Sequence, residues 1–289
     1  MLRIIRDLIL IALFIFAIYL FAKTQKYNSR YWPKEIKITD IGLTNIDSVL
    51  VQNDTALVPV NYVGSIDFRD VNPEKRKDLF IQFLLPAIVI TRERLMDDLH
   101  HVEFLEERVS KKKKIAKVDS IFLDGMKMKY ETDSLKELKK RIYPHPVSMA
   151  LAQAILESGW GTSGIFRKGN NIFGIMSFSS DDSRYKIRFP DSNVKRYIRT
   201  YDSIIASVED YYLLISKVSS YKKFRQKRWN GAPSDELFRY INSYHESDQY
   251  INMAHSIIDS NNLKHYDNIP ISPKYLKYNT LFSFLTQLP

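Results

Sequence analysis

The spacing of apolar residues predicts a mainly helical chain from residue 73 onward. Helical periodicity runs through 74–99, where Pro86 predicts a kink, and it resumes in 133–142, where Asp133 or Ser134 supplies the N-cap. A charged helix or solvated turn is predicted over 102–117, and further helices over 147–157, 203–218, 234–243 and 248–261.

Other segments carry strand patterns or no regular pattern. Residues 24–73 alternate short β-type runs with polar breaks, which predicts an extended stalk or a strand-rich linker. Residues 184–201 predict a β-hairpin that turns at 190–193, where Pro, Asp, Ser and Asn stand together. Residues 266–289 are aromatic and irregular and are predicted to be a C-terminal tail. The pattern therefore predicts a mainly α domain over 74–265 with a small β element.

The N-terminal residues carry a long apolar run, 8–22, with basic residues on both sides. Together with the residues before it, the run approaches the roughly 20 residues that a bilayer span requires. A cleaved signal peptide would carry small residues before its cleavage point, and a buried core helix would not stand at the N-terminus between basic residues. We therefore predict an uncleaved signal anchor over 1–23 that forms a transmembrane helix. Basic residues on both sides leave its orientation undecided.

The chain is basic and contains no cysteine. Its formal net charge of +10 is typical of proteins with anionic partners, such as nucleic acid, anionic lipid or an acidic wall polymer. The lack of cysteine excludes disulfides, thiolate catalysis and Cys-type zinc sites. The 6 histidines show no ligand spacing, so neither a metal site nor a cofactor is predicted.

One carboxylate stands at the C-terminal end of the helix predicted over 147–157. The partial negative charge of a helix C-terminus disfavours an ionised Glu157, and apolar neighbours such as Trp160 act in the same direction, so we expect a raised pKa. A carboxylic acid that stays protonated near neutral pH is what a glycosidase uses to protonate the leaving oxygen. Because a lone Glu near a helix end usually faces solvent without a role, the surrounding residues must decide between the two interpretations.

Glycine, tryptophan and asparagine follow this carboxylate at short spacing. Gly159 and Gly161 stand on either side of Trp160, which brings backbone close to a ligand and leaves an indole face for stacking on a sugar ring. Asn170 and Asn171 offer donors and acceptors that suit hydroxyl and N-acetyl groups. The same two side chains also suit a turn that braces the preceding helix, and the two roles are compatible.

The segments ALAQAILESGWGTS and GNNIFGI resemble the signature of the glucosaminidase family of glycoside hydrolases, in particular its Bax-type bacterial members. The resemblance continues through residues 201–214 and through the tyrosine pair Tyr244 and Tyr250, and it covers roughly residues 74–262. It implies a lysozyme-like α-helical domain over 74–265 with a small β-hairpin lobe.

The resemblance also implies an activity and the residues for it. The activity is that of an endo-β-N-acetylglucosaminidase, which cleaves β-1,4 bonds of peptidoglycan glycan strands, with Glu157 as general acid. Tyr250 would orient the substrate N-acetyl group or the attacking water, while Tyr244 is either a substrate contact or a packed tyrosine. The remaining substrate-binding residues would be Trp160, Gly161, Asn170, Asn171 and Phe173.

The second catalytic group stays open. Family members carry an acidic residue on the hairpin lobe, whereas this hairpin is basic and offers Tyr185 or Tyr197 within its strands. Asp182 is our first choice and Asp191 our second. A tyrosine and the substrate's own N-acetyl group are further candidates for this role. The inverting or retaining outcome depends on this choice, because the separation of the two carboxyl groups decides it.

Two other functions stay open beside the glucosaminidase. A lytic transglycosylase uses one Glu on a lysozyme-like fold but forms an anhydro product, and a wall-binding protein would keep the fold without turnover. Nucleic-acid binding rests on charge alone and is not expected. With the predicted anchor, a peptidoglycan hydrolase would be a single-pass protein of the inner membrane, with its catalytic domain in the periplasm or cell envelope.

Overall fold

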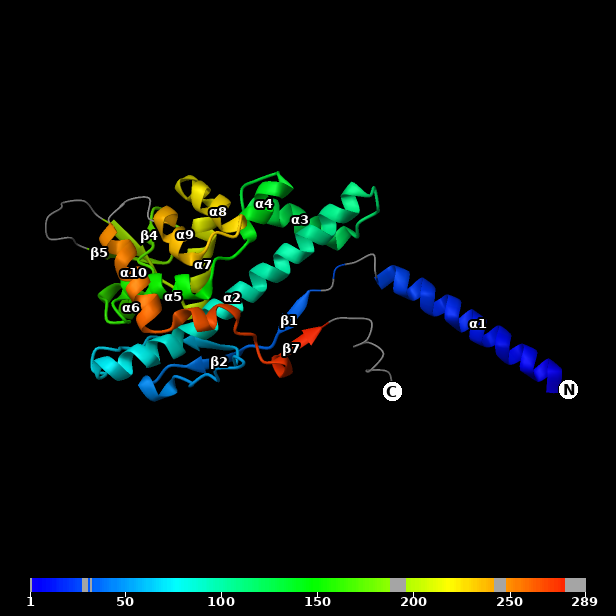
Figure 1. The fold of residues 1–289 in the computed structure, drawn as a ribbon, viewed down its shortest axis with the longest axis horizontal. Helices are drawn as coiled ribbons and strands as arrows, with labels where there is room; N and C mark the ends of the chain where they lie inside the picture. Colours follow the sequence, from blue (N-terminus) through cyan, green and yellow to red (C-terminus); the bar gives the residue numbers. More distant parts are fainter. Residues whose placement is uncertain (1, 28–30, 32, 188–195, 242–247, 279–289) are drawn as a thin grey trace.

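Helices dominate the computed structural model, which describes residues 2–27, 31, 33–187, 196–241 and 248–278 (Figure 1). The helices are α1 (Leu2–Tyr27), α2 (Pro73–Ser110), α3 (Lys117–Lys129), α4 (Leu135–Ile142), α5 (Val147–Ser158), α6 (Gly164–Gly169), α7 (Ile204–Lys217), α8 (Lys222–Trp229), α9 (Ser234–Ile241) and α10 (Asp248–Ser260). The strands are β1 (Lys34–Ile36), β2 (Thr39–Gly42), β3 (Val60–Val63), β4 (Met176–Ser177), β5 (Arg184–Ile187), β6 (Arg196–Arg199) and β7 (Leu276–Tyr278). The predicted mainly α fold is confirmed.

The long helix α2 organises the helical body. The Asn72 side chain caps its start by accepting a hydrogen bond from a backbone amide of the first turn at 3.0 Å. The helix then continues through Pro86, which is buried, and packs against α4, α5 and α7. The predicted segment 74–99 and the first part of 102–117 are therefore one helix. Core contacts along its apolar face sustain it past the proline.

Helix α5 lies inside the core, with every residue from Val147 to Ile155 buried. At its start, the Asp267 carboxylate accepts hydrogen bonds from the Ser148 amide at 2.7 Å and from the Ser148 hydroxyl at 3.0 Å. This contact satisfies a free amide of the first turn and places negative charge at the positive end of the helix. Asp267 belongs to the short 3₁₀ helix Leu263–Asn268, which packs on α5. A residue from far along the chain thus holds the helix that carries Glu157.

The described strands form three small sheets. β5 and β6 make the predicted antiparallel hairpin, with Arg184 opposite Arg199, and β4 pairs with the other edge of β6. We call β4, β5 and β6 the β lobe. β2 and β3 are parallel, and β1 pairs antiparallel with β7. The hairpin turn predicted at 190–193 lies outside the described residues.

The segments on both sides of the helical body contribute to one hydrophobic core. Tyr62 and Phe68, from the region predicted as a linker, are buried in the same cluster as the apolar residues of α2 and α5. Ile269 and Ile271, from the region predicted as a tail, are buried there too. The β1–β7 pair joins these two regions directly (Figure 1).

Helix α1 stands apart from the helical body (Figure 1). The sequence predicted a transmembrane helix over 1–23. Within the described residues, no helix has the combination of length and hydropathy that a membrane crossing requires. The structure therefore does not support this part of the fold prediction.

Candidate active site

Helix α5 ends at Ser158, one residue after Glu157. Hydrogen bonds within the sequence motif hold the loop that follows. The Ser158 hydroxyl donates to the Ala154 carbonyl at 2.6 Å and accepts from the Gly161 amide at 3.0 Å. Both contacts are buried, so Ser158 shapes the loop and does not face a ligand. The position of Glu157 at the helix end is thereby fixed from both sides.

Three consecutive residues after the helix have left-handed backbone conformations, with φ of 56° at Gly159, 58° at Trp160 and 76° at Gly161. At Gly161 a Cβ atom would come within 2.6 Å of Phe68 and 2.9 Å of Phe80, so packing as well as φ demands glycine. The Trp160 ring meets Phe80 edge-on, with centroids 6.3 Å apart. The fold of the loop therefore accounts for the glycines of the motif, and no ligand is needed to explain them.

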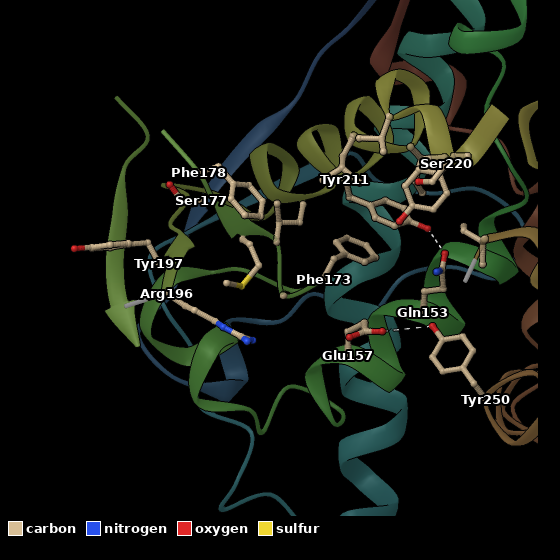
Figure 2. A pocket seen from close by; sticks show the side chains of 18 residues that line it. Gln153, Glu157, Phe173, Ser177, Phe178, Arg196, Tyr197, Tyr211, Ser220 and Tyr250 are labelled. Atoms are coloured by element: carbon tan, nitrogen blue, oxygen red, sulfur yellow. Dashed lines mark hydrogen bonds between the residues drawn. The ribbon is translucent and has the colours of Figure 1, made fainter. Parts of the chain in front are cut away.

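Glu157 opens onto a cleft of about 950 Å³ that is lined by α5, α7, α10 and the β lobe (Figure 2). This volume falls within the range that ligand pockets occupy. Aromatic side chains reach the cleft from both its helical side and its β-lobe side. They are Phe173, Phe178, Tyr197, Tyr211, Tyr221 and Tyr250.

The Glu157 carboxyl is open to the cleft but has protein atoms around it. This burial raises its pKa above the ordinary Glu value, and a hydrogen bond from Tyr250 opposes the rise. The Tyr250 hydroxyl oxygen lies 3.4 Å from Glu157 Oε1. The contact is long for this type of bond, and such bonds often tighten when substrate binds. Burial also raises the pKa of Tyr250, so its hydroxyl stays protonated and available as a donor.

A second carboxylate, Asp182, lies at the β lobe in a different environment. It accepts hydrogen bonds from the Ser177 hydroxyl at 2.8 Å and from Arg199 Nε at 3.2 Å, and both contacts lower its pKa. Arg199 also pairs with Asp210 at 2.7 Å. Ser177 lines the cleft, whereas Asp182 is not part of the lining. No group of His, Asp and Glu in the described parts of the chain has the arrangement of a metal site.

Comparison with known proteins assigns a family to this region. Residues 132–263 match the glucosaminidase family, described as mannosyl-glycoprotein endo-β-N-acetylglucosaminidase. These residues form a glucosaminidase domain. The matched range contains Glu157 and the β lobe, and the resemblance inferred from the sequence is confirmed.

Two curated proteins from different bacteria are similar to this chain. The chain is 29% identical over 168 residues to Protein bax of Escherichia coli (strain K12), a match that covers 56% of this chain and 58% of that protein. It is 26% identical over 148 residues to Exo-glucosaminidase LytG of Bacillus subtilis (strain 168), covering 46% of this chain and 50% of that protein. The chain therefore spans between half and three fifths of the length of these curated relatives.

Solved structures similar to this chain include two bacterial domains. One is the catalytic domain of the autolysin Auto from Listeria monocytogenes, with 20% identity, coverage of 57% of this chain and 96% of that chain, and a TM-score of 0.36. Another is the glycoside hydrolase domain of FlgJ from Salmonella typhimurium, with 22% identity, coverage of 48% and 88%, and a TM-score of 0.34.

The cleft of the glucosaminidase domain brings together three residues predicted from the sequence, which are Glu157, Phe173 and Tyr250. Glu157 is the penultimate residue of α5, and its pKa is raised as expected, with burial as the first cause. Phe173 stacks on Tyr211 with ring centroids 3.8 Å apart. Their catalytic and binding roles stay predictions.

Four residues predicted to bind substrate do not line the cleft: Trp160, Gly161, Asn170 and Asn171. The Asn171 amide donates to the carbonyls of Ile175 and Arg199, each at 2.9 Å, and accepts from the Ile175 amide at 2.9 Å. The Asn170 amide donates to the Tyr201 carbonyl at 2.9 Å. These contacts tie the loop to β6 and to the residues on both sides of it. They are not made to the helix that carries Glu157, so the predicted bracing of that helix stays a prediction.

The candidates for the second catalytic group are dispersed. Tyr197 lines the cleft, whereas Asp182 and Tyr185 do not. Asp191, like the predicted substrate residue Tyr244, lies outside the described residues. In the described part of the lining, Glu157 is the only carboxylate.

Among the cleft residues that the sequence interpretation missed are Gln153, Tyr211 and Arg196. Gln153 stands one helical turn before Glu157, and this spacing places both on one face of α5. Tyr211 lies in a segment that resembles the family but was given no role. Arg196 projects from β6 toward the cleft, although the sequence interpretation treated it only as part of a basic hairpin (Figure 2).

Proposed function

We propose that this protein is a peptidoglycan hydrolase that cleaves β-1,4 bonds of the glycan strand as an endo-β-N-acetylglucosaminidase. One observation carries the proposal: Glu157, a carboxyl with a raised pKa, opens onto a cleft of about 950 Å³ within a glucosaminidase domain. A groove of this size with aromatic walls suits a chain of sugar rings.

In the proposed reaction, Glu157 donates its proton to the glycosidic oxygen while the bond to the leaving sugar breaks. The raised pKa keeps the carboxyl protonated over more of the near-neutral range. Proton donation leaves a carboxylate, and the Tyr250 hydroxyl at 3.4 Å is placed to stabilise that new charge. Tyr250 thus acts on the acid, beside the N-acetyl or water contact that the sequence suggested.

The second group is the open part of the mechanism. Since Glu157 is the only carboxylate in the described lining, we favour a route in which the substrate's N-acetyl oxygen stabilises the positive charge at the anomeric carbon. Asp182 is the protein's own candidate, because its partner Ser177 lines the cleft. The anomeric configuration of the first product, measured by NMR, tests whether a carboxylate activates water, because that route inverts the configuration. Retention fits either N-acetyl assistance or a carboxylate nucleophile, and the activity of Asp182→Asn then separates these two.

The β-lobe side of the cleft offers surfaces for sugar stacking. Phe178 is 90% exposed, although a large aromatic side chain gains little by facing water. Tyr197 lies on the same side and stacks with the Arg184 guanidinium, whose carbon is 4.2 Å from the ring centroid. Flat rings at this wall suit the apolar faces of pyranose rings.

The test is a digest of purified peptidoglycan by the wild-type protein and by Glu157→Gln, with the soluble products analysed by mass spectrometry. We expect fragments that end in reducing N-acetylglucosamine from the wild type, and none above background from the variant. Thermal melting of both proteins controls for folding.

Two outcomes of this digest would overturn the proposal. Fragments with 1,6-anhydromuramyl ends would identify a lytic transglycosylase. Wall binding by both proteins without any released fragment would identify a binding protein. Fragment length then separates endo from exo cleavage, a relevant point because the relative LytG is named an exo-glucosaminidase.

We also propose that α1 holds the protein at the inner membrane, with the catalytic domain in the periplasm or cell envelope. Each large apolar side chain between Ile9 and Tyr19 is more than half exposed, and a helix that is apolar all round is normally covered by protein or lipid. Membrane fractions washed with alkaline carbonate give the test. Retention of the full-length protein supports an anchor, whereas release into the wash, or a shortened mature protein, contradicts it.

A further inference from the structure

A second pocket, of about 550 Å³, lies at the opposite end of α5 from the cleft. His145 and Pro146, which directly precede the first residue of α5, belong to its lining, whereas Glu157 stands near the last residue of the helix. At 1.5 Å per residue, the two ends are roughly 15 Å apart. The described linings of the pocket and the cleft share no residue. The pocket is therefore a separate space, and we call it the α5 N-terminal pocket.

Charged side chains from α2, α8 and the 3₁₀ helix Leu263–Asn268 line this pocket: Arg92, Glu93, Arg228 and Asp267. Three of them have partners within the protein. Arg92 donates hydrogen bonds to the carbonyls of Asp267 and Ile269, each at 2.6 Å. Glu93 pairs with Lys34 at 2.7 Å, and the Asp267 carboxylate accepts from Ser148. These three side chains thus serve the fold.

Arg228 is the exception in the described lining. It is 3% exposed, yet no described carboxylate forms an ion pair with it. In the part of the chain that the structure describes, its guanidinium makes one hydrogen bond, from Nη2 to the Lys140 carbonyl at 2.7 Å, and Nε has no partner. Burial lowers the pKa of Arg228 to about 10, so the group is still a cation at pH 7. A buried cation is normally paired with an anion, and Arg228 lacks that partner.

Arg225, one turn earlier in α8, shows what a buried arginine usually receives. It is 2% exposed and does not line the α5 N-terminal pocket. Its Nη1 donates to the carbonyls of Ile215 and Val218 at 2.9 and 2.8 Å. Its Nε lies 3.8 Å from a carboxylate oxygen of Glu137. The protein therefore supplies a carboxylate to the arginine that is closed off from the pocket, and none to the arginine that lines it.

The charges of the lining indicate which kind of anion fits. Arg228 and the positive end of α5 attract a negative group. Glu93 and Asp267 lie in the same lining and repel further negative charge, so a ligand with one negative charge is favoured over a ligand with two. A guanidinium also matches the planar oxygens of a carboxylate. The remaining volume suits a short peptide or a molecule of that size.

We propose that the α5 N-terminal pocket binds a small ligand that ends in a single carboxylate, such as the C-terminus of a short peptide, through Arg228. The ligand would lie against His145 and Pro146, at the start of the helix that carries Glu157. The peptide stems of peptidoglycan end in a carboxylate of this kind. The site does not depend on the proposed hydrolysis, however, and its test measures binding alone.

The test is isothermal titration calorimetry of the full-length protein in detergent at pH 8. The probes are N-acetyl-D-alanyl-D-alanine, the same peptide with a C-terminal amide, and inorganic phosphate, which is largely a dianion at this pH. We expect the acid to bind at least about tenfold more tightly than the amide, because only the acid pairs with Arg228, and phosphate to bind more weakly than the acid. Equal binding of acid and amide, tighter binding of phosphate, or no binding of the acid would each overturn the proposal.

Variants place the peptide in the pocket. Arg228→Met removes the charge and should weaken binding of the acid by at least about tenfold. Because this change also removes the Lys140 contact, two variants of the exposed lining residue Asn268 leave Arg228 intact. Asn268→Asp should weaken binding by about threefold or more, and Asn268→Lys should strengthen it by a similar factor. Asn252→Asp makes the same charge change at an exposed position of α10 outside the described lining and should leave the affinity unchanged.

Glu157→Gln separates this site from the cleft and should bind the acid as tightly as the wild type does. Loss of binding in Glu157→Gln would place the peptide in the cleft and overturn the proposal. So would an affinity that is unchanged in both Asn268 variants. Binding that persists in a protein without fragment release supports the α5 N-terminal pocket and overturns only the proposed function.

Discussion

One carboxylate, Glu157, lines the cleft, and another, Asp182, is bonded to the lining residue Ser177 of the β lobe. The surroundings of the two are opposite. Glu157 lies among apolar and phenolic groups, and burial raises its pKa. Asp182 is held by the Ser177 hydroxyl and the Arg199 guanidinium, and these donors lower its pKa. The same functional group is thus prepared to hold a proton in one place and a negative charge in the other.

The difference indicates which of the two carboxyl groups serves catalysis and which serves the stability of the fold. A carboxyl whose proton is available is suited to acid catalysis, while a carboxylate already satisfied by two donors is suited to structure. Asp182, Arg199 and Asp210 link the strands of the β lobe to α7. We therefore expect the helical side to govern turnover and the β-lobe side to govern stability, and the following measurements challenge this division.

The largest expected difference is in turnover. Glu157→Gln should lower kcat by at least about 10³-fold, because general acid catalysis is lost. Asp182→Asn should lower kcat by no more than about tenfold, since this side chain is not part of the lining. Fragment release from peptidoglycan measures both. A loss in Asp182→Asn that equals the loss in Glu157→Gln would establish Asp182 as the second catalytic carboxylate.

Alanine substitutions at two glycines compare the rigidity of the backbone on the helical side and on the β-lobe side of the cleft. Gly161, after α5, has φ of 76° and would place a Cβ 2.6 Å from Phe68, whereas Gly174, before β4, has φ of 65° and open space around it. Gly161→Ala should lower the free energy of unfolding by about 2–4 kcal/mol, through strain and overpacking together. Gly174→Ala should lower it by about 1 kcal/mol from strain alone. Chemical denaturation measures both, and equal losses would show that the Gly161 loop yields to the extra atom.

The ion pairs of the β lobe should make the free energy of unfolding depend on pH in the acid range. Arg199→Met should lower the free energy of unfolding at pH 7 by about 1 kcal/mol, a modest figure because the pairs are partly open to water. A lowered pKa means that Asp182 stabilises the fold above its unfolded pKa of about 3.9, and that this contribution disappears as pH falls through the folded pKa. The difference between wild type and variant should therefore shrink by pH 3. An equal difference at pH 3 and pH 7 would contradict this account.

The smallest expected effect is a gain in stability. A raised pKa in the folded state makes the ionised Glu157 unfavourable, so stability falls as pH rises above the unfolded pKa of about 4.3. Glu157→Gln removes this penalty and should raise the Tm at pH 7 by no more than about 2 °C, with no gain below pH 4. A variant with a lower Tm at pH 7 would mean that Glu157 stabilises its own site.

Local features of the fold followed from the sequence. The Ser134 hydroxyl caps α4 by accepting from the Glu137 amide at 3.3 Å, one of the two caps expected. The predicted helices 203–218 and 248–261 correspond closely to Ile204–Lys217 and Asp248–Ser260. Caps and helical periodicity depend on residues within a few positions, so a single sequence contains the information for them.

The cleft depends on pairs that are distant in the chain, and a single sequence does not contain them. Gln153 acquires its hydrogen-bond partner only because Tyr211 arrives from another helix. Asn170 and Asn171 have the same chemistry whether they bind a sugar or a backbone carbonyl, so the sequence left both roles open. The structure shows their amides bonded to backbone.

The Asp267 cap of α5 lies beyond the matched range 132–263, 119 residues after the Ser148 that it holds. The ribosome therefore synthesises helix α5 before it synthesises the residue that caps this helix. A nascent chain that has already exposed the whole family signature still lacks the carboxylate that completes the first turn of that helix. The proposed acid thus reaches its final support only when the ribosome has moved past the catalytic sequence, so the timing of translation is part of how this site is assembled.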